Sequence, residues 1–83
     1  MRRKIVAGNW KLHGNRAFAI ELVARVAAHM PLGDVQVLIL PPLPYLSSLI
    51  ADFTASHLSF GAQDLSSNDK GAYTGEVSAS MLV

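Results

Sequence analysis

Two polar side chains that can do chemistry lie two residues apart near the start of the chain. Asn9 and Lys11 follow a short run, residues 4–7, that reads as a strand. In a strand, side chains at positions i and i+2 point to the same face, so the amide and the ammonium are expected to act together. The ammonium would attract a phosphate-bearing anion and stabilise negative charge that develops on a substrate oxygen. The Asn9 amide would donate to the same substrate and accept from Lys11, which would hold the ammonium in place.

An isolated Asn-x-Lys pair is a weak signal, because a solvated lysine after a strand is a commoner arrangement. Trp10 lies between the two residues and is expected to face the opposite way, where its ring would pack against a helix or loop. His13 lies in the turn that follows and could approach a pocket, whereas His29 and His57 are predicted to lie on the surface. No two of these histidines have a carboxylate at ligand spacing, so we expect no metal site.

Composition and missing motifs exclude several other classes of function. The 83 residues are 51% hydrophobic and carry a net charge of +1, which gives no reason to expect a nucleic-acid partner. The chain has no glycine-rich phosphate loop and no Gly-x-Ser-x-Gly elbow, so nucleotide binding and acyl transfer are unsupported. No apolar run approaches the roughly 20 residues of a membrane span. We therefore interpret the chain as cytoplasmic and without a membrane partner.

The elements that must position Asn9 and Lys11 alternate between strand-like and helix-like periods. Runs at 4–7, 35–40 and 58–63 are predicted to be strands, with helices between them. This order is typical of parallel βα units and places the chain in the α/β class. The run 35–40 is almost entirely apolar, which favours a strand that is covered on both faces.

Both predicted helices carry an apolar stripe at helical spacing. The first should begin after Asn15, which can cap it, and continue to about Met30, with Pro31 and Gly33 ending it. The second is short and follows the second strand. The stripes consist of Ala19, Leu22, Val23, Val26, Ala27 and Met30 in the first helix, and of Leu46, Leu49, Ile50 and Phe53 in the second.

Residues 64–76 form the longest stretch without a period. A loop of this length inside a compact unit is usually functional or mobile, although a solvated connection is the simpler interpretation. The run 77–83 that follows is helix-like and contains no glycine, asparagine or basic residue to end it. This suggests that the sequence is cut within a helix.

Three sequence blocks give the chain a specific resemblance. Gly-Asn-Trp-Lys at 8–11, Gly-Ala-Gln-Asp at 61–64 and Gly-Ala-Tyr-Thr-Gly-Glu-Val-Ser at 71–78 are similar to blocks of the triosephosphate isomerase family, in the same order and spacing. Leu12 and His13 depart from the Met-Asn of many members. The resemblance implies a TIM (β/α)8 barrel, which takes roughly 250 residues. Residues 1–83 would then be the N-terminal part of a single barrel domain, with the first two to three βα units and a truncated C-terminus.

The resemblance also implies a reaction. Members of the family interconvert dihydroxyacetone phosphate and glyceraldehyde 3-phosphate through an enediol(ate), without a cofactor, in glycolysis and gluconeogenesis. Lys11 would be catalytic, and Asn9 and Lys11 would bind the phosphorylated triose. Triosephosphate isomerase is itself a standard case of a glutamate base working with a neutral histidine, and both fall outside the residues matched here. The 83-residue chain alone is therefore expected to be inactive.

The same resemblance implies a homodimer. In the family, the loop that corresponds to residues 64–76 reaches across a two-fold axis to a pocket beside the partner's active site, which would make Thr74 and Glu76 dimer contacts. The alternative is that these 83 residues form a complete product that binds a phosphorylated ligand, or another chain, without catalysis. Three parallel strands with open edges and an uncovered apolar face make that alternative physically poor.

Overall fold

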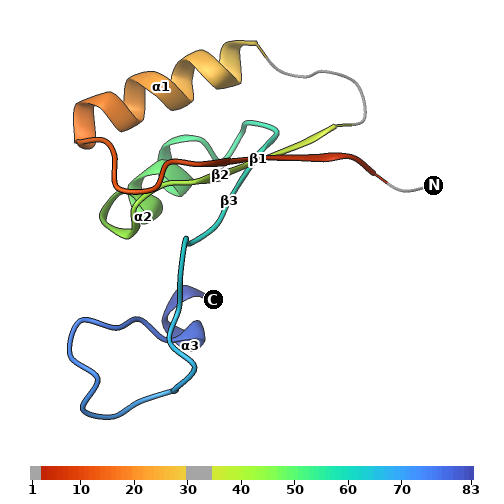
Figure 1. Ribbon diagram of the computed structural model, residues 1–83. Coiled ribbons are helices and arrows are strands. Elements are labelled where there is room, and N and C mark those ends of the chain that lie inside the picture. The colour runs from red at the N-terminus through yellow and green to blue at the C-terminus, as the bar shows by residue number, and fades with distance from the viewer. Residues whose placement is uncertain (1–2, 30–34) are drawn as a thin grey trace.

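Strands and helices alternate along the chain, as the sequence predicts. The computed structural model describes residues 3–29 and 35–83. Figure 1 shows the two longer helices, the sheet, and a loop with a short helix that extends away from it. In chain order the elements are β1 (Ile5–Asn9), α1 (Arg16–Ala28), β2 (Gln36–Leu40), α2 (Leu43–Asp52), β3 (Leu58–Phe60) and α3 (Ala79–Leu82).

The three strands form one parallel sheet in the order β1-β2-β3. Asn9 pairs with Leu40, and Ile39 pairs with Phe60. Parallel strands bring their carboxyl ends to the same edge, so the turns after β1, β2 and β3 all leave from that edge. The prediction of parallel βα units is confirmed.

Helix α1 begins where its cap predicts. Asn15 has extended backbone angles, and its side-chain oxygen accepts from the amide of Phe18 at 2.9 Å. This bond satisfies one of the amides that the first turn leaves unpaired. The helix ends at Ala28, with His29 as the C-cap. The predicted end at Met30, Pro31 and Gly33 lies outside the described residues.

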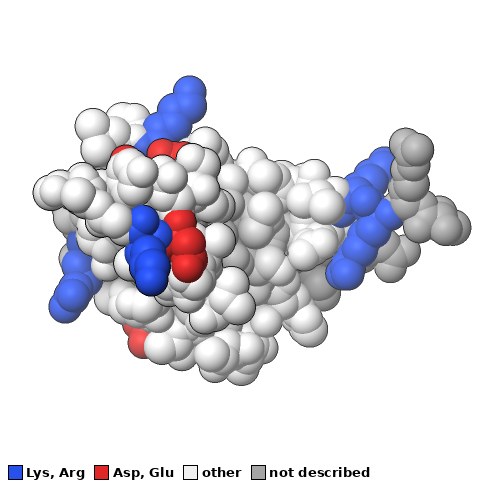
Figure 2. All heavy atoms as spheres, turned by 90° about the horizontal axis from the view of Figure 1, so that it is seen from below, with Lys and Arg blue, Asp and Glu red and all other residues white. Residues whose placement is uncertain are grey.

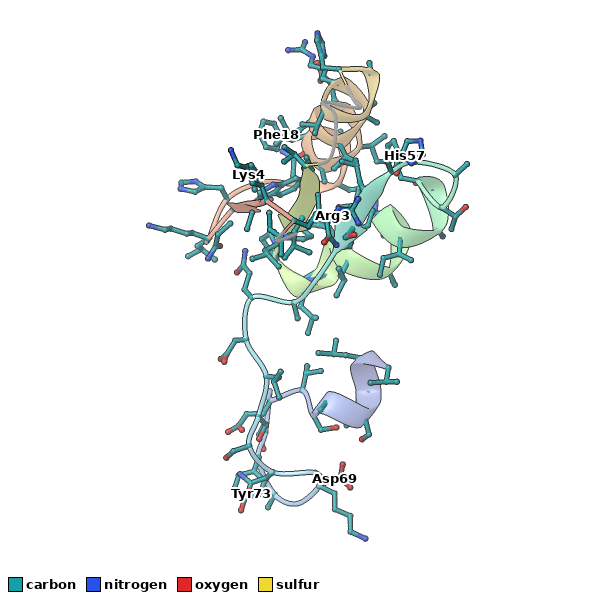
Figure 3. All side chains as sticks on the ribbon, turned by 90° about the vertical axis from the view of Figure 1, so that its right-hand side faces the viewer. Arg3, Lys4, Phe18, His57, Asp69 and Tyr73 are labelled. Carbon is teal, nitrogen blue, oxygen red and sulfur yellow. The ribbon has the colours of Figure 1, made fainter. Side chains whose placement is uncertain are left out.

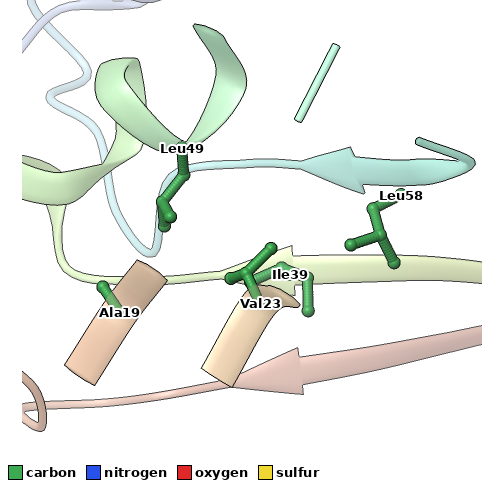
Figure 4. Close-up of a cluster of buried hydrophobic side chains, with 5 residues drawn as sticks. All are labelled: Ala19, Val23, Ile39, Leu49 and Leu58. Atoms are coloured by element: carbon green, nitrogen blue, oxygen red, sulfur yellow. The ribbon is translucent and has the colours of Figure 1, made fainter. Parts of the chain in front are cut away.

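The core lies on one face of the sheet and joins both longer helices to it. Figure 4 shows buried side chains from α1 and α2 meeting those of β2 and β3. Both helices therefore pack on the same face of the sheet, and the core between them holds the strands in place. The cluster consists of Ala19, Val23, Ile39, Leu49 and Leu58.

The predicted stripe of α2 is correct except at one position. Leu46 and Leu49 are buried and Phe53 packs against the core, but Ile50 is 44% exposed. The predicted helix is confirmed, and Ile50 is the member of its stripe that stays partly exposed. It lies at the border of the stripe and lines an apolar hollow together with Val77 and with residues of α2 and α3.

The described residues cover only one face of the sheet. The prediction of cover on both faces of the second strand is therefore not met here, although its side chains are buried or half-buried. The register places Ile5, Leu38 and Ser59 together on the face opposite the helices. No described helix packs there, and Ile5 is 61% exposed.

Residues 64–76 contain no helix or strand, as predicted. The third strand is shorter than predicted, because β3 ends at Phe60, although the Gly61 amide still donates to Ile39 O at 3.0 Å. The amide of Ser66 donates to Val77 O at 2.8 Å and brings the two limbs of the loop together. Such closed loops keep a defined shape without secondary structure.

Charge is spread thinly over the surface. On the face shown in Figure 2, basic side chains lie at separate places and a large area between them is uncharged. Among residues 3–29 and 35–83, no helix is long and apolar enough to cross a bilayer.

Candidate active site

Asn9 and Lys11 lie at the edge where the strands end. Asn9 is the last residue of β1 and Leu40 is the last residue of β2. The amide of Trp10 donates to Leu40 O at 3.1 Å, which continues the pairing of β1 and β2 by one residue. Lys11 therefore leaves the sheet at its carboxyl edge, the position where parallel βα folds place their reactive groups.

The backbone of Lys11 is in an unusual conformation. Its φ is 54°, in the left-handed region, and it is the only non-glycine residue in the described part of the chain with a positive φ. A lysine there costs about 1–3 kcal/mol and stays only when its surroundings hold it. The Asn9 side-chain oxygen accepts from the Lys11 amide at 2.8 Å.

That bond differs in one respect from the sequence-based expectation. Asn9 does accept from Lys11, but from its backbone amide rather than from its ammonium. The bond to the backbone N–H closes a short turn between the two residues. Asn9 therefore fixes the turn from which the ammonium projects, and its own N–H donors remain available to a ligand.

Aromatic side chains anchor the turn that follows β1. Trp10 packs against the core and meets Phe18 edge-to-face, with ring centroids 6.2 Å apart and planes at 72°. The prediction that Trp10 has a packing role is confirmed. Gly14 has a φ of 113°, and the hydroxyl of Tyr45 on α2 donates to its carbonyl at 3.1 Å. Helix α2 thus supports the turn that carries Lys11.

Gln63 contributes to this edge of the sheet, and the sequence-based site did not include it. Its Nε2 donates to Lys11 O and to Leu40 O, both at 2.9 Å. The available signal was its place three residues after Phe60, where the third parallel strand reaches the same edge as β1 and β2. Glutamine at a strand end is common enough that this signal alone was weak.

The histidines do not gather at the site. His29 lies at the C-cap of α1, where its Nδ1 lies 2.7 Å from Arg25 O and donates to it, and His57 is exposed in the turn before β3. His13 is exposed in the turn after Lys11. In the described part of the chain, no three His, Cys, Asp or Glu residues group closely enough to hold a metal ion.

Thr74 and Glu76 lie on the loop that extends away from the sheet, and both are exposed. Figure 3 shows the labelled Asp69 and Tyr73 at the far end of this loop, well away from the strands. The chain therefore does not bring Thr74 or Glu76 to its own Lys11. A hollow of about 460 Å³ lies between the two limbs of the loop and is lined by Gln63 and Glu76, among others, but not by Asn9 or Lys11.

Parallel strands that alternate with helices on one face of the sheet, with polar groups where the strands end, are the arrangement found in βα-barrel proteins. A family model described as triosephosphate isomerase matches residues 4–83 of this chain. The chain belongs to the triosephosphate isomerase family, and its elements are the first βα units of the TIM barrel of that family.

Individual relatives are similar over all 83 residues. The chain is 83% identical to triosephosphate isomerases from Xanthomonas euvesicatoria pv. vesicatoria (strain 85-10) and from Xanthomonas axonopodis pv. citri (strain 306). It is 70% identical to the triosephosphate isomerase of Stenotrophomonas maltophilia (strain K279a). The chain spans 33% of the length of each of these curated relatives.

Proposed function

We propose that residues 1–83 are the N-terminal part of a barrel enzyme that interconverts dihydroxyacetone phosphate and glyceraldehyde 3-phosphate. The observation that carries the proposal is the Asn9–Lys11 turn at the carboxyl edge of β1, in a chain that belongs to this family. The reaction moves a proton between two adjacent substrate carbons through an enediol(ate). A phosphorylated triose is the substrate, no cofactor takes part, and the enzyme is cytoplasmic.

Lys11 and Asn9 supply charge and hydrogen bonds rather than a base. In the enediol(ate), negative charge develops on the oxygens of the substrate, and the substrate carries its phosphate throughout. An ammonium fixed at the strand end stabilises both charges, and the effect grows when water is excluded. The N–H donors of the Asn9 amide add a directional contact to a substrate oxygen. The proton-transferring glutamate and histidine of the family belong to residues beyond those matched here.

The first test compares two lengths of protein. The full-length protein that contains these residues should interconvert the two triose phosphates in a coupled assay, whereas the purified 83-residue chain should show no turnover above buffer. Binding of the substrate by the short chain, together with no turnover by the full-length protein, would support the alternative of a non-catalytic, phosphate-binding fragment. Turnover by the short chain would contradict the roles assigned here, because it requires a base within residues 1–83.

The proposal includes a homodimer formed through the loop 64–76. This loop extends from the sheet and is closed at its base by the bond between Ser66 and Val77, so it can reach a partner as a defined unit. Thr74 and Glu76 are exposed on it and are the proposed dimer contacts.

Thr74→Glu in the full-length protein is expected to weaken the dimer. A carboxylate would be buried at the contact without a partner, and the removal of an unpaired charge from water costs several kcal/mol. Sedimentation velocity at nanomolar to micromolar concentration should show the dissociation constant rising by at least about a hundredfold. Thr54→Glu, the same change at an exposed position outside the loop, is the matched control. An unchanged Thr74→Glu dimer would remove Thr74 from the interface.

A further inference from the structure

Gln63 ties the Lys11 turn to the end of the neighbouring strand. A single nitrogen, Nε2, donates to Lys11 O and to Leu40 O at 2.9 Å each, across 52 and 23 residues of sequence. Leu40 O also accepts from the Trp10 amide at 3.1 Å. One side chain from the end of the third strand therefore connects the ends of all three strands at the edge where the ammonium leaves the sheet.

The backbone of Lys11 has two polar groups, and each is held by a different side chain. Asn9 Oδ1 accepts from its N–H at 2.8 Å, and Gln63 donates to its carbonyl at 2.9 Å. A residue with φ of 54° relaxes toward more favourable angles unless its neighbours prevent it. Rotation of this backbone would swing the side chain and carry the ammonium away from its place at the strand end.

We propose that Gln63 is a positioning residue for Lys11: its amide nitrogen bridges the Lys11 and Leu40 carbonyls and holds the left-handed turn that aims the ammonium. The proposal rests on the proposed function, because it assigns Gln63 an effect on the reaction through Lys11. Gln63 itself need not touch the substrate.

The chemistry of glutamine suits this task. The bridge needs two N–H donors on one nitrogen to reach two carbonyl oxygens, and a primary amide supplies them without charge. An ionised glutamate has no donor, and its charge would repel both carbonyls. A lysine would donate, but its ammonium would compete with Lys11 for the anionic substrate. A neutral glutamine therefore holds the Lys11 backbone without adding a second positive charge beside the Lys11 ammonium.

The test uses Gln63→Glu in the full-length protein, because this change keeps the size of the side chain and removes both donors. We expect kcat/KM at pH 8 to fall about ten- to a hundredfold, the scale of loss for a displaced catalytic group. The matched control is Gln36→Glu. Gln36 Nε2 donates to Ser59 Oγ at 3.1 Å near the opposite end of the sheet, so its loss should leave kcat/KM unchanged.

A second comparison separates positioning from a general effect on stability. In a Lys11→Ala background there is no ammonium to place, so adding Gln63→Glu should cause no further loss of kcat/KM. An equal loss in both backgrounds would overturn the proposal, as would wild-type kcat/KM in Gln63→Glu alone. If Gln63→Glu does not fold, Gln63→Met gives the same comparison with a neutral side chain.

The proposed function and this inference can fail separately. A wild-type protein without isomerase turnover would overturn the function, but amide exchange at Lys11 would still test the bridge. Measured by NMR, exchange of the Lys11 amide should be faster in Gln63→Glu than in the wild type or in Gln36→Glu, because the turn then opens more often. Unchanged exchange would overturn the positioning role whatever the activity.

Discussion

Lys11→Ala in the full-length protein should lower kcat/KM by at least about a hundredfold, and by up to about a thousandfold. This is the range found when one donor to a developing oxyanion is removed, about 3–4 kcal/mol. Lys11 follows the carboxyl end of β1, and Asn9 holds its backbone amide. The Lys11 side chain therefore starts from a fixed backbone position. Steady-state kinetics in both directions of the reaction measure the loss.

Two further variants show whether the loss is chemical. Lys4→Ala removes an exposed lysine at the opposite end of β1 and should leave turnover unchanged. Lys11→Gly should be as inactive as Lys11→Ala but at least as stable as the wild type, because glycine accepts a φ of 54° without strain. An active Lys11→Gly protein would exclude the ammonium from the reaction.

Leu49→Ala should lower the free energy of unfolding of the full-length protein by about 2–5 kcal/mol, the range for truncation of a buried leucine. Leu49 is fully buried on α2 and packs in the cluster that joins both helices to the sheet (Figure 4). Its loss leaves a cavity between α1, α2 and β2, which the surrounding side chains can fill only in part. Urea unfolding followed by circular dichroism gives the difference.

Ile50→Ala is the matched control for this result. Ile50 is the next residue on the same helix and is 44% exposed, so its truncation should cost well under half as much. An equal cost at both positions would show that Ile50 is covered in the full-length protein. A small cost for Leu49→Ala would contradict the core described here.

Most of the fold could be predicted from local patterns. The strands have short apolar runs, Asn15 marks the start of α1, and the stripe of α1 identifies Ala19 and Val23 as core. The exposure of Ile50 does not follow from the stripe, since a residue at the border of a stripe is buried or exposed according to what packs beside it. Periodicity does not contain that information.

The candidate site was predicted in part. Residue types and spacing predict that Asn9 and Lys11 act together, but the resemblance, rather than the spacing, implies a role in catalysis. The left-handed φ of Lys11 and its bond to Gln63 could not be predicted from the sequence, because they depend on contacts between residues 52 positions apart. Local sequence determines the strand ends, and only the folded sheet determines which side chains meet there.

The sheet face opposite the helices has a consequence for biosynthesis. Ile5 and Leu38 lie on it, and no described element covers them. In a parallel barrel such a face is covered only when the later strands have paired and the barrel has closed. These long-range pairings form slowly. A nascent chain leaving the ribosome would therefore expose this apolar surface while the later strands are still being translated.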